Sequence, residues 1–202
     1  MKLYGHPDSG HAFKVKFCLE AAKIDHEYEV VNIFQPRNRR QPEFVARSKF
    51  CEVPLLIDGE NNLIQSDAIL LYIAKKYAVL GGDSAELMDR VTEWLFWEAN
   101  KIGMCLPQLR AHKKFDVFRL EQGAWDWLYA RYLNDVDALE NELQDGRPFI
   151  CGKDLTVADF SLSSYLFFAD EAEVPVPPAV SNWLERLKAN PAWKHPYELL
   201  AG

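Results

Sequence analysis

The pattern of secondary structure changes near residue 80 of this 202-residue chain, and the change limits the folds that the chain can adopt. Before this point, short apolar runs typical of strands alternate with runs of helical periodicity, whereas every later pattern is helical. The segment Leu80-Gly81-Gly82-Asp83-Ser84 has the composition of a linker. The sequence therefore predicts a mixed α/β domain over residues 1–79 and an all-helical domain over residues 85–202, with residues 80–84 between them.

The first domain has the order strand, helix, strand, strand, strand, helix. The first strand, helix and second strand are predicted over residues 2–4, 10–22 and 26–32. Residues 55–57 and 63–64 then flank a turn-rich loop, which indicates a β-hairpin followed by a helix. A βαβ unit followed by a ββα unit predicts a small mixed sheet, parallel in its first half and antiparallel in its second, with helices on its faces.

The second domain is predicted to be a bundle of helices. They cover residues 91–106, 125–143 and 178–190, with a further helix that begins at Thr156. The first of these is expected to be one long helix that ends near Pro107. Thr156 and Asp159 match a capping box, in which Asp takes the place usually held by Glu.

Composition and charge exclude several classes of function. The net charge of -7 argues against nucleic acid as a partner, because phosphate binding requires a basic surface. No apolar run approaches the roughly 18 residues that span a bilayer, so we expect no membrane partner and a cytoplasmic location. The cysteines are isolated from one another, which predicts neither a metal site nor a dithiol centre; they are Cys18, Cys51, Cys105 and Cys151.

The start of the helix after the hairpin is the first candidate binding element. Ser66 is a candidate N-cap, and a helix N-terminus presents unpaired backbone N–H groups that suit a carboxylate. Gln65 and Asp67 beside it are suited to an ammonium group. The alternative interpretation is that Ser66 only caps the helix.

Ser9 is the second candidate, because it follows the first strand and precedes the first helix. Its hydroxyl could donate a hydrogen bond to an anion at that helix terminus, or it could only cap the helix. The first interpretation is favoured because three candidate elements are expected to lie close together. In a sheet of this topology, the end of the first strand, the loop before Pro54 and the helix start at Ser66 lie on one edge.

Several motifs, taken together in their order and spacing, resemble the soluble glutathione S-transferase family over essentially the full chain, and in particular its serine-using, theta-like or phi-like and related bacterial classes. The motifs are Leu3-Tyr4-Gly5 with Ser9, Pro42-Glu43-Phe44, Val53-Pro54, Gln65-Ser66-Asp67-Ala68-Ile69 and Gly152-Lys153-Asp154-Leu155-Thr156-Val157-Ala158-Asp159. The resemblance implies a thioredoxin-like first domain, an all-helical second domain and a cis peptide bond before Pro54.

The resemblance also implies that glutathione is the co-substrate, with no metal. Val53 would then face its cysteine portion, and Gln65 and Ser66 would hold its γ-glutamyl end. Arg39 and Arg40 align approximately with a basic pair that binds the glycyl carboxylate in some classes. The loop over residues 48–52 departs from the family's usual Asn-Pro-x-Gly, and its Glu52 would face that carboxylate unless one of the arginines intervenes.

The implied chemistry is activation of the glutathione thiol as a thiolate by Ser9. A hydrogen bond to a charged partner contributes roughly 1.5 to 3 kcal/mol, and one pKa unit corresponds to about 1.4 kcal/mol, so a single hydroxyl would lower the thiol pKa by about one to two units. Tyr4 is the competing catalytic residue, since some members of the family use a tyrosine at the end of the first strand. The predicted function is a glutathione transferase that acts on small electrophiles, mostly apolar.

The electrophile pocket is expected between the two domains. Its candidate residues are His11, Phe13, Trp97, Lys101, Met104 and Phe115, although aromatic residues at helical spacing are more often part of a core. The resemblance further implies a two-fold homodimer. Two alternatives stay open: a catalytically silent glutathione-binding or protein-interaction module, and a glutathione-dependent peroxidase, isomerase or dehalogenase on the same fold.

Overall fold

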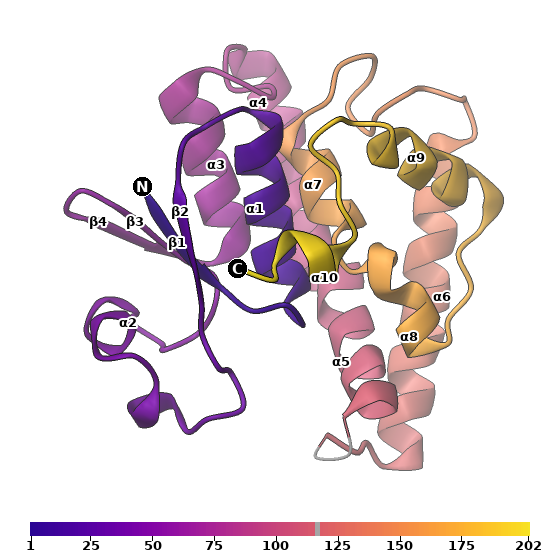
Figure 1. Ribbon diagram of the computed structural model, residues 1–202. Coiled ribbons are helices and arrows are strands. Elements are labelled where there is room, and N and C mark those ends of the chain that lie inside the picture. The colour runs from indigo at the N-terminus through magenta and orange to yellow at the C-terminus, as the bar shows by residue number, and fades with distance from the viewer. Residues whose placement is uncertain (116–117) are drawn as a thin grey trace.

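The computed structural model describes residues 1–115 and 118–202. Its first part contains a four-stranded sheet with the order β2-β1-β3-β4 (Figure 1). The strands are β1 (Lys2–Gly5), β2 (Glu27–Val30), β3 (Leu55–Asp58) and β4 (Asn61–Ile64). β1 pairs with β2 in parallel and with β3 antiparallel, and β3 pairs antiparallel with β4. The predicted mixed sheet is therefore confirmed.

Buried side chains cover both faces of the sheet, because successive residues of a strand point to opposite faces. Leu3 of β1 packs in the large core cluster with α1 (Gly10–Ala21) and α3 (Ser66–Tyr77). Its neighbour Tyr4 packs in a separate cluster with Phe44 of α2 (Pro42–Arg47), which follows a short 3₁₀ turn at Arg37–Arg39. The first domain thus has the thioredoxin-like arrangement that was predicted.

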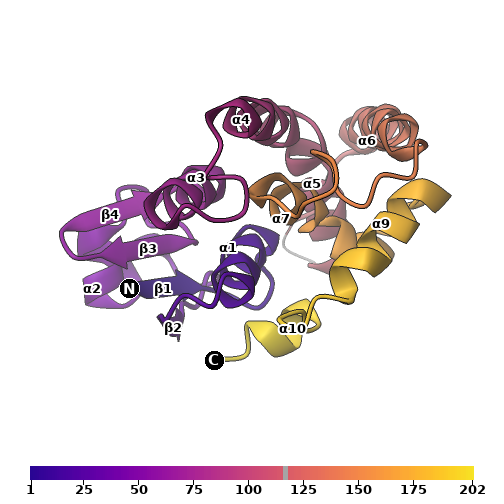
Figure 2. The ribbon, with the colours of Figure 1, turned by 90° about the horizontal axis from the view of Figure 1, so that it is seen from above.

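The rest of the described chain is helical, as predicted. Its helices are α4 (Ala85–Asn100), α5 (Ile102–Lys114), α6 (Gln122–Leu143), α7 (Val157–Ser163), α8 (Ala169–Ala172), α9 (Pro178–Lys188) and α10 (Pro196–Leu199), with a 3₁₀ turn at Leu166–Phe168. Helices α1 and α3 lie between the sheet and the helices α4, α5 and α7 (Figure 2). One large core cluster of buried apolar side chains runs through both parts.

The prediction of one long helix up to Pro107 is wrong. Lys101 has φ −121° and ψ −106°, far from helical values, and it separates α4 from α5. Pro107 lies inside α5, five residues after Ile102, so the helix continues past it although one helical hydrogen bond is lost. The apolar period continues across the break, which is why the sequence pattern does not reveal it.

The predicted capping box at α7 is formed. The Asp159 carboxylate accepts hydrogen bonds from the backbone N–H of Thr156 at 2.9 Å and from the Thr156 hydroxyl at 3.0 Å. It also accepts from the backbone N–H of Ile150 at 2.8 Å and from Trp183 Nε1 of α9 at 3.0 Å. This buried carboxylate therefore joins α7, α9 and the preceding loop at one point.

The segment that joins the two parts packs tightly on α3. A Cβ atom at Gly82 would lie 1.9 Å from the Ala74 carbonyl oxygen, so only glycine fits there. The Leu80 carbonyl accepts a hydrogen bond from the backbone N–H of Val157 at the start of α7. Among residues 1–115 and 118–202, no helix is long and apolar enough to cross a membrane, and no three His, Cys, Asp or Glu side chains are placed to hold a metal ion.

Candidate active site

A cavity of about 460 Å³ opens between the hairpin, the start of α3 and the helices α4 and α5. Its lining consists of His11, Phe50, Glu52, Val53, Pro54, Ile64, Gln65, Ser66, Asp67, Ala68, Leu71, Leu95, Phe96, Glu98, Ala99 and Gly103. The cavity therefore brings together the loop before β3 and the N-terminus of α3, which the sequence analysis placed on one edge of the sheet, and adds the first turn of α1 through His11.

The backbone beside the hairpin agrees in part with expectation. The Val53–Pro54 peptide bond is cis, as the resemblance implied. Gln65 has a φ of +69°, unusual for a residue with a side chain, and it occupies the N-cap position of α3. The prediction that Ser66 is the N-cap is therefore wrong by one residue: the turn at Gln65 leaves Ser66 already in the first helical position.

His11 and Ser66 meet inside the cavity. Ser66 Oγ lies 3.4 Å from His11 Nδ1, and the ring of His11 packs edge-on against Tyr165 at 5.0 Å. Burial, with the nearby charge of Lys14, lowers the pKa of His11 to about 3, so the imidazole is neutral near pH 7. The cavity thus contains a neutral nitrogen and a hydroxyl next to the N-terminus of α3.

Ser9 caps α1 and is almost completely buried. Its Oγ accepts a hydrogen bond from the backbone N–H of Ala12 at 3.1 Å. The hydroxyl proton is not used by that contact, so Ser9 can cap the helix and donate to an anion as well. Ser9 is not among the residues that line the cavity, but it precedes His11, which does, by two positions in the first turn of α1.

Tyr4 points away from this region. Its side chain lies on the face of the sheet that α2 covers, and its hydroxyl donates a hydrogen bond to Glu43 at 2.5 Å. Burial and the contact with Glu43 raise the pKa of Tyr4, because both disfavour a second negative charge there. Tyr4 therefore links β1 to α2.

The loop before Val53 is held by arginines, although in a different pattern from the predicted one. Glu52 pairs with Arg37 at 2.5 Å, and not with Arg39 or Arg40 as expected. Arg40 donates hydrogen bonds to the backbone carbonyls of Cys51 and Ile33, so it supports the loop. Arg39 is exposed and lies in the 3₁₀ turn.

Cys51 in this loop has a φ of +51°, a conformation that favours glycine. It occupies the position at which the Asn-Pro-x-Gly pattern has glycine. The loop therefore keeps the backbone turn of that pattern without its residue, while Ser48 Oγ and the carbonyl of Glu52 lie 3.3 Å apart across the turn.

A buried ionic network behind the cavity was missed by sequence reasoning. Lys14 of α1 is fully buried, and its Nζ donates to Asp67 of α3 at 2.9 Å and to Glu98 of α4 at 3.1 Å. Ser161 Oγ lies 3.0 Å from the same nitrogen and donates to Asp67 at 2.6 Å. The available signal was a lysine between the apolar residues Phe13 and Val15.

The charged groups of this network shift one another's pKa values. Burial alone would lower the pKa of Lys14, but the carboxylates of Glu98 and Asp67 outweigh it and raise that pKa. Burial raises the pKa of Glu98 to about 7 despite the attraction of Lys14. Because Asp67 and Glu98 both line the cavity, Lys14 supplies the buried positive charge that holds two acidic side chains at its wall.

The predicted electrophile-pocket residues are not all in one place. His11 lines the cavity, whereas Phe13 is fully buried against Phe17 and Phe167. Trp97 lines a second, smaller hollow over α4 and residues 142–151. The remaining three lie along α5 and its flanks: Lys101 at the break before α5, Met104 against the core, and Phe115 in edge-on contact with Phe34 and Phe118.

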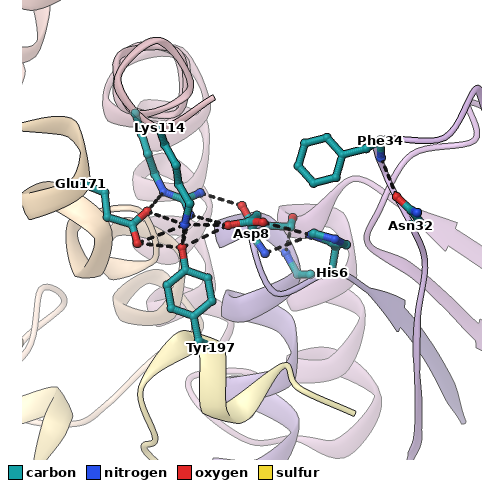
Figure 3. Close-up of polar contacts among 10 residues, drawn as sticks. His6, Asp8, Asn32, Phe34, Lys114, Glu171 and Tyr197 are labelled. Atoms are coloured by element: carbon teal, nitrogen blue, oxygen red, sulfur yellow. Dashed lines mark hydrogen bonds and ion pairs between the residues drawn. The ribbon is translucent and has the colours of Figure 1, made fainter. Parts of the chain in front are cut away.

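A polar cluster lies beside the loop between β1 and α1. The side chains of Lys114 and Tyr197 contact both Asp8, the residue before Ser9, and Glu171 (Figure 3). Arg110 of α5, which is buried, pairs with both Asp8 and Glu171. The cluster therefore connects the loop that contains Ser9 to three helices of the second part.

Comparison with known proteins agrees with this arrangement. Residues 1–75 match the family described as glutathione S-transferase, N-terminal domain, and residues 107–186 match its C-terminal domain. Glutathione S-transferase 1 of Schizosaccharomyces pombe is 30% identical over 223 residues, which include 97% of this chain and 94% of that protein.

Solved structures have the same fold. A possible glutathione S-transferase from Rhodopseudomonas palustris has a TM-score of 0.87 and 25% identity, covering 97% of both chains. A glutathione transferase from Burkholderia graminis, with two glutathione molecules bound per subunit, has a TM-score of 0.83 and 24% identity, covering all of this chain and 87% of that one. The chain belongs to the glutathione S-transferase family.

Proposed function

We propose that this protein binds glutathione in the cavity between the hairpin and α3, stabilises its thiolate with Ser9, and transfers the sulfur to small electrophiles, mostly apolar. The observation that carries this proposal is the convergence of three elements on one cavity: the cis Val53–Pro54 bond, the helix terminus at Gln65 and Ser66, and the first turn of α1.

The γ-glutamyl end and the cysteinyl portion of glutathione have matching chemistry in the cavity. The N-terminus of α3 and the Ser66 hydroxyl suit the α-carboxylate of the γ-glutamyl group, and Asp67 suits its ammonium. The backbone of Val53 is suited to pair with the cysteinyl portion. The glycyl carboxylate would lie near Glu52, whose charge is balanced by Arg37, with Arg39 and Arg40 nearby in the chain.

The reaction step needs a thiolate, because a free thiol with a pKa near 8.5 is only a few per cent ionised at neutral pH. The thiol proton leaves to solvent, and the Ser9 hydroxyl keeps its own proton and donates a hydrogen bond to the sulfur. The N-terminus of α1 adds roughly 0.3 to 1 kcal/mol in the same direction. The sulfur then attacks an electrophilic carbon, a C–S bond forms, and the leaving group departs with its electron pair.

The proposal includes a homodimer, which the solvent exposure of two phenylalanines at the cavity supports. Phe96 of α4 is 73% exposed and Phe50 is 44% exposed, and both line the cavity. Large apolar side chains exposed together are typical of surfaces that a partner covers. A second copy of the chain would bury them and complete the walls of the cavity.

Two measurements on the purified protein test the proposal: retention on immobilised glutathione, and conjugation of glutathione to an activated aryl chloride by wild type and Ser9→Ala. We expect retention of both proteins and a fall of about tenfold or more in kcat for Ser9→Ala, which corresponds to the one to two pKa units of the lost hydrogen bond.

The outcomes separate the alternatives. Retention without turnover by the wild type would identify a catalytically silent glutathione-binding module. Turnover that survives Ser9→Ala would remove the thiolate role from Ser9. The absence of any retention would overturn the proposal that the cavity binds glutathione.

A further inference from the structure

Arg110 of α5 is a buried cation that contacts the residue before Ser9. It is 2% exposed, and its guanidinium carbon lies 3.9 Å from the centroid of the Phe168 ring. Its Nη1 donates to the backbone carbonyl of Asp8 at 2.7 Å, and its Nη2 donates to the Asp8 carboxylate at 3.1 Å. Arg110 and Asp8 are 102 residues apart in the sequence.

The Asp8 carbonyl belongs to the same rigid peptide group as the N–H of Ser9. That N–H donates to the His6 carbonyl at 2.9 Å, so both ends of the peptide group before Ser9 are held. On the other side of Ser9, the backbone N–H of Ala12 fixes the position of Oγ at 3.1 Å. The direction in which the Ser9 hydroxyl points therefore depends on where Arg110 holds the Asp8 carbonyl.

The guanidinium is itself fixed from two other helices. Its Nε donates to Glu171 of α8 at 2.7 Å, and its Nη2 donates to the Tyr197 hydroxyl of α10 at 2.7 Å. Lys114 contacts the same three groups from the outer side (Figure 3). The positive charges of Arg110 and Lys114 therefore balance the negative charges of Asp8 and Glu171. A planar guanidinium can serve several acceptors at fixed angles, which a lysine ammonium cannot do as well.

We infer that Arg110 is a positioning residue that orients the Ser9 hydroxyl toward the glutathione sulfur, so that the helical part of the chain controls the activity of the loop between β1 and α1. This inference rests on the proposed function of Ser9. Arg110 itself does not contact glutathione in this account, so its removal acts on kcat through Ser9 and leaves glutathione affinity nearly unchanged.

A double-mutant cycle tests the inference, with Arg110→Met and Ser9→Ala singly and together. We expect kcat to fall about tenfold in Arg110→Met, with a change of less than about twofold in the KM for glutathione, because a small misplacement of a catalytic group is costly. In the Ser9→Ala background, Arg110→Met should cause no further fall.

Two further variants make the test specific. Lys113→Met is the matched control, since Lys113 is in the same turn of α5 but pairs with Glu173 and does not contact Asp8; it should keep kcat within about twofold of the wild type. Arg110→Lys keeps the buried positive charge, and it replaces Arg110→Met in the test if the methionine variant does not fold. It should have an intermediate kcat, because a lysine cannot hold the carbonyl and both carboxylates together.

The results distinguish two kinds of failure. An equal fall in kcat from Arg110→Met in both backgrounds, or a loss that appears mainly in the KM for glutathione, would overturn the positioning role while leaving Ser9 in place. A wild type without conjugating activity, or a fully active Ser9→Ala, would overturn the proposed function itself. A fall in kcat from Arg110→Met that occurs in the wild-type background but not in the Ser9→Ala background supports both the positioning role and the proposed function.

Discussion

At the scale of single residues, the two candidate hydroxyls of β1 and α1 differ in what they can reach. The Tyr4 hydroxyl donates a hydrogen bond to Glu43 on the face of the sheet opposite α1. Ser9 Oγ accepts a hydrogen bond from the backbone N–H of Ala12, and this contact does not use the proton of the Ser9 hydroxyl. This difference follows from the alternation of side chains along β1, which turns Leu3 toward α1 and Tyr4 away from it.

Tyr4→Phe should therefore leave kcat unchanged and lower only the stability. Glu43 is half exposed and keeps its ion pair with Lys2 at 2.9 Å, so the loss of one hydrogen bond should cost about 0.5 to 1.5 kcal/mol of the free energy of unfolding. Urea titration and steady-state kinetics measure the two effects. A tenfold fall in kcat without a fall in stability would restore Tyr4 as the catalytic residue.

His11 should make the protein less stable in mild acid. Its pKa is about 3 in the folded protein and near 6.5 in the unfolded chain, so the unfolded state gains the proton first as the pH falls below 6.5. At pH 5 the loss should approach about 2 kcal/mol, from roughly 1.5 pH units at about 1.4 kcal/mol each.

His11→Asn removes this titration and keeps a polar group beside Ser66. The free energy of unfolding of this variant should change less between pH 7 and pH 4 than that of the wild type. Parallel stability profiles for the two proteins over this range would show that the imidazole is not held neutral by burial.

At the scale of elements, α7 depends on a single carboxylate for its N-terminus. Asp159 accepts hydrogen bonds from two backbone N–H groups, the Thr156 hydroxyl and Trp183, and it is fully buried. Asp159→Asn has one acceptor oxygen and turns a donor toward other donors. We expect it to lower the free energy of unfolding by about 3 kcal/mol or more, measured by urea titration.

The control for this variant is Asp154→Asn. Asp154 lies in the same loop, but its side chain is 73% exposed and pairs only loosely with Lys153, at 3.9 Å. Its substitution should change the stability by less than about 0.5 kcal/mol. A similar loss in both variants would mean that the loop as a whole, and not the capping box, limits stability.

The elements also show what the sequence can predict. Periodicity and turn residues predicted the strands, α1, the hairpin and α6, because these signals are local. The break at Lys101 was not predicted, since it lies in an unusual backbone conformation without proline or glycine at that position. Pro107 was expected to end a helix, but α5 continues past it, because the burial of Cys105, Leu106 and Leu109 in the core outweighs one lost helical hydrogen bond.

The site was predictable to a similar degree. Val53, Pro54, Gln65 and Ser66 line the cavity, because short motifs at element ends determine where such backbone groups point. The roles of the residues that support the site were missed, because their contacts join distant parts of the sequence. Arg37 contacts a residue 15 positions away, Arg110 contacts one 102 positions away, and the partners of Lys14 are 53 to 147 positions away. A single sequence contains no local signal for such pairs.

At the scale of the whole molecule, Lys14 joins the two parts of the chain. Its partners come from α3, α4 and α7, so its ammonium links the first domain to the helical part. Lys14→Met would leave Glu98, only 1% exposed, without its counter-ion. We expect a loss of about 3 to 5 kcal/mol in the free energy of unfolding.

The same variant tests whether the two parts unfold together. All six tryptophans lie after residue 90, so tryptophan fluorescence reports only on the helical part, whereas circular dichroism reports on the whole chain. The wild type should give coincident denaturation curves by the two methods, and Lys14→Met should separate them. Curves that stay coincident at an unchanged midpoint would show that Lys14 does not couple the two parts.

The most direct test of the central account is a titration of the thiol of enzyme-bound glutathione, followed by the ultraviolet absorbance of the thiolate. For the wild type, the pKa should lie about one to two units below the value near 8.5 of a free thiol, and Ser9→Ala should return it most of the way. If the bound thiol titrates like free glutathione in the wild type, or if its pKa is the same in Ser9→Ala, then Ser9 does not stabilise the thiolate.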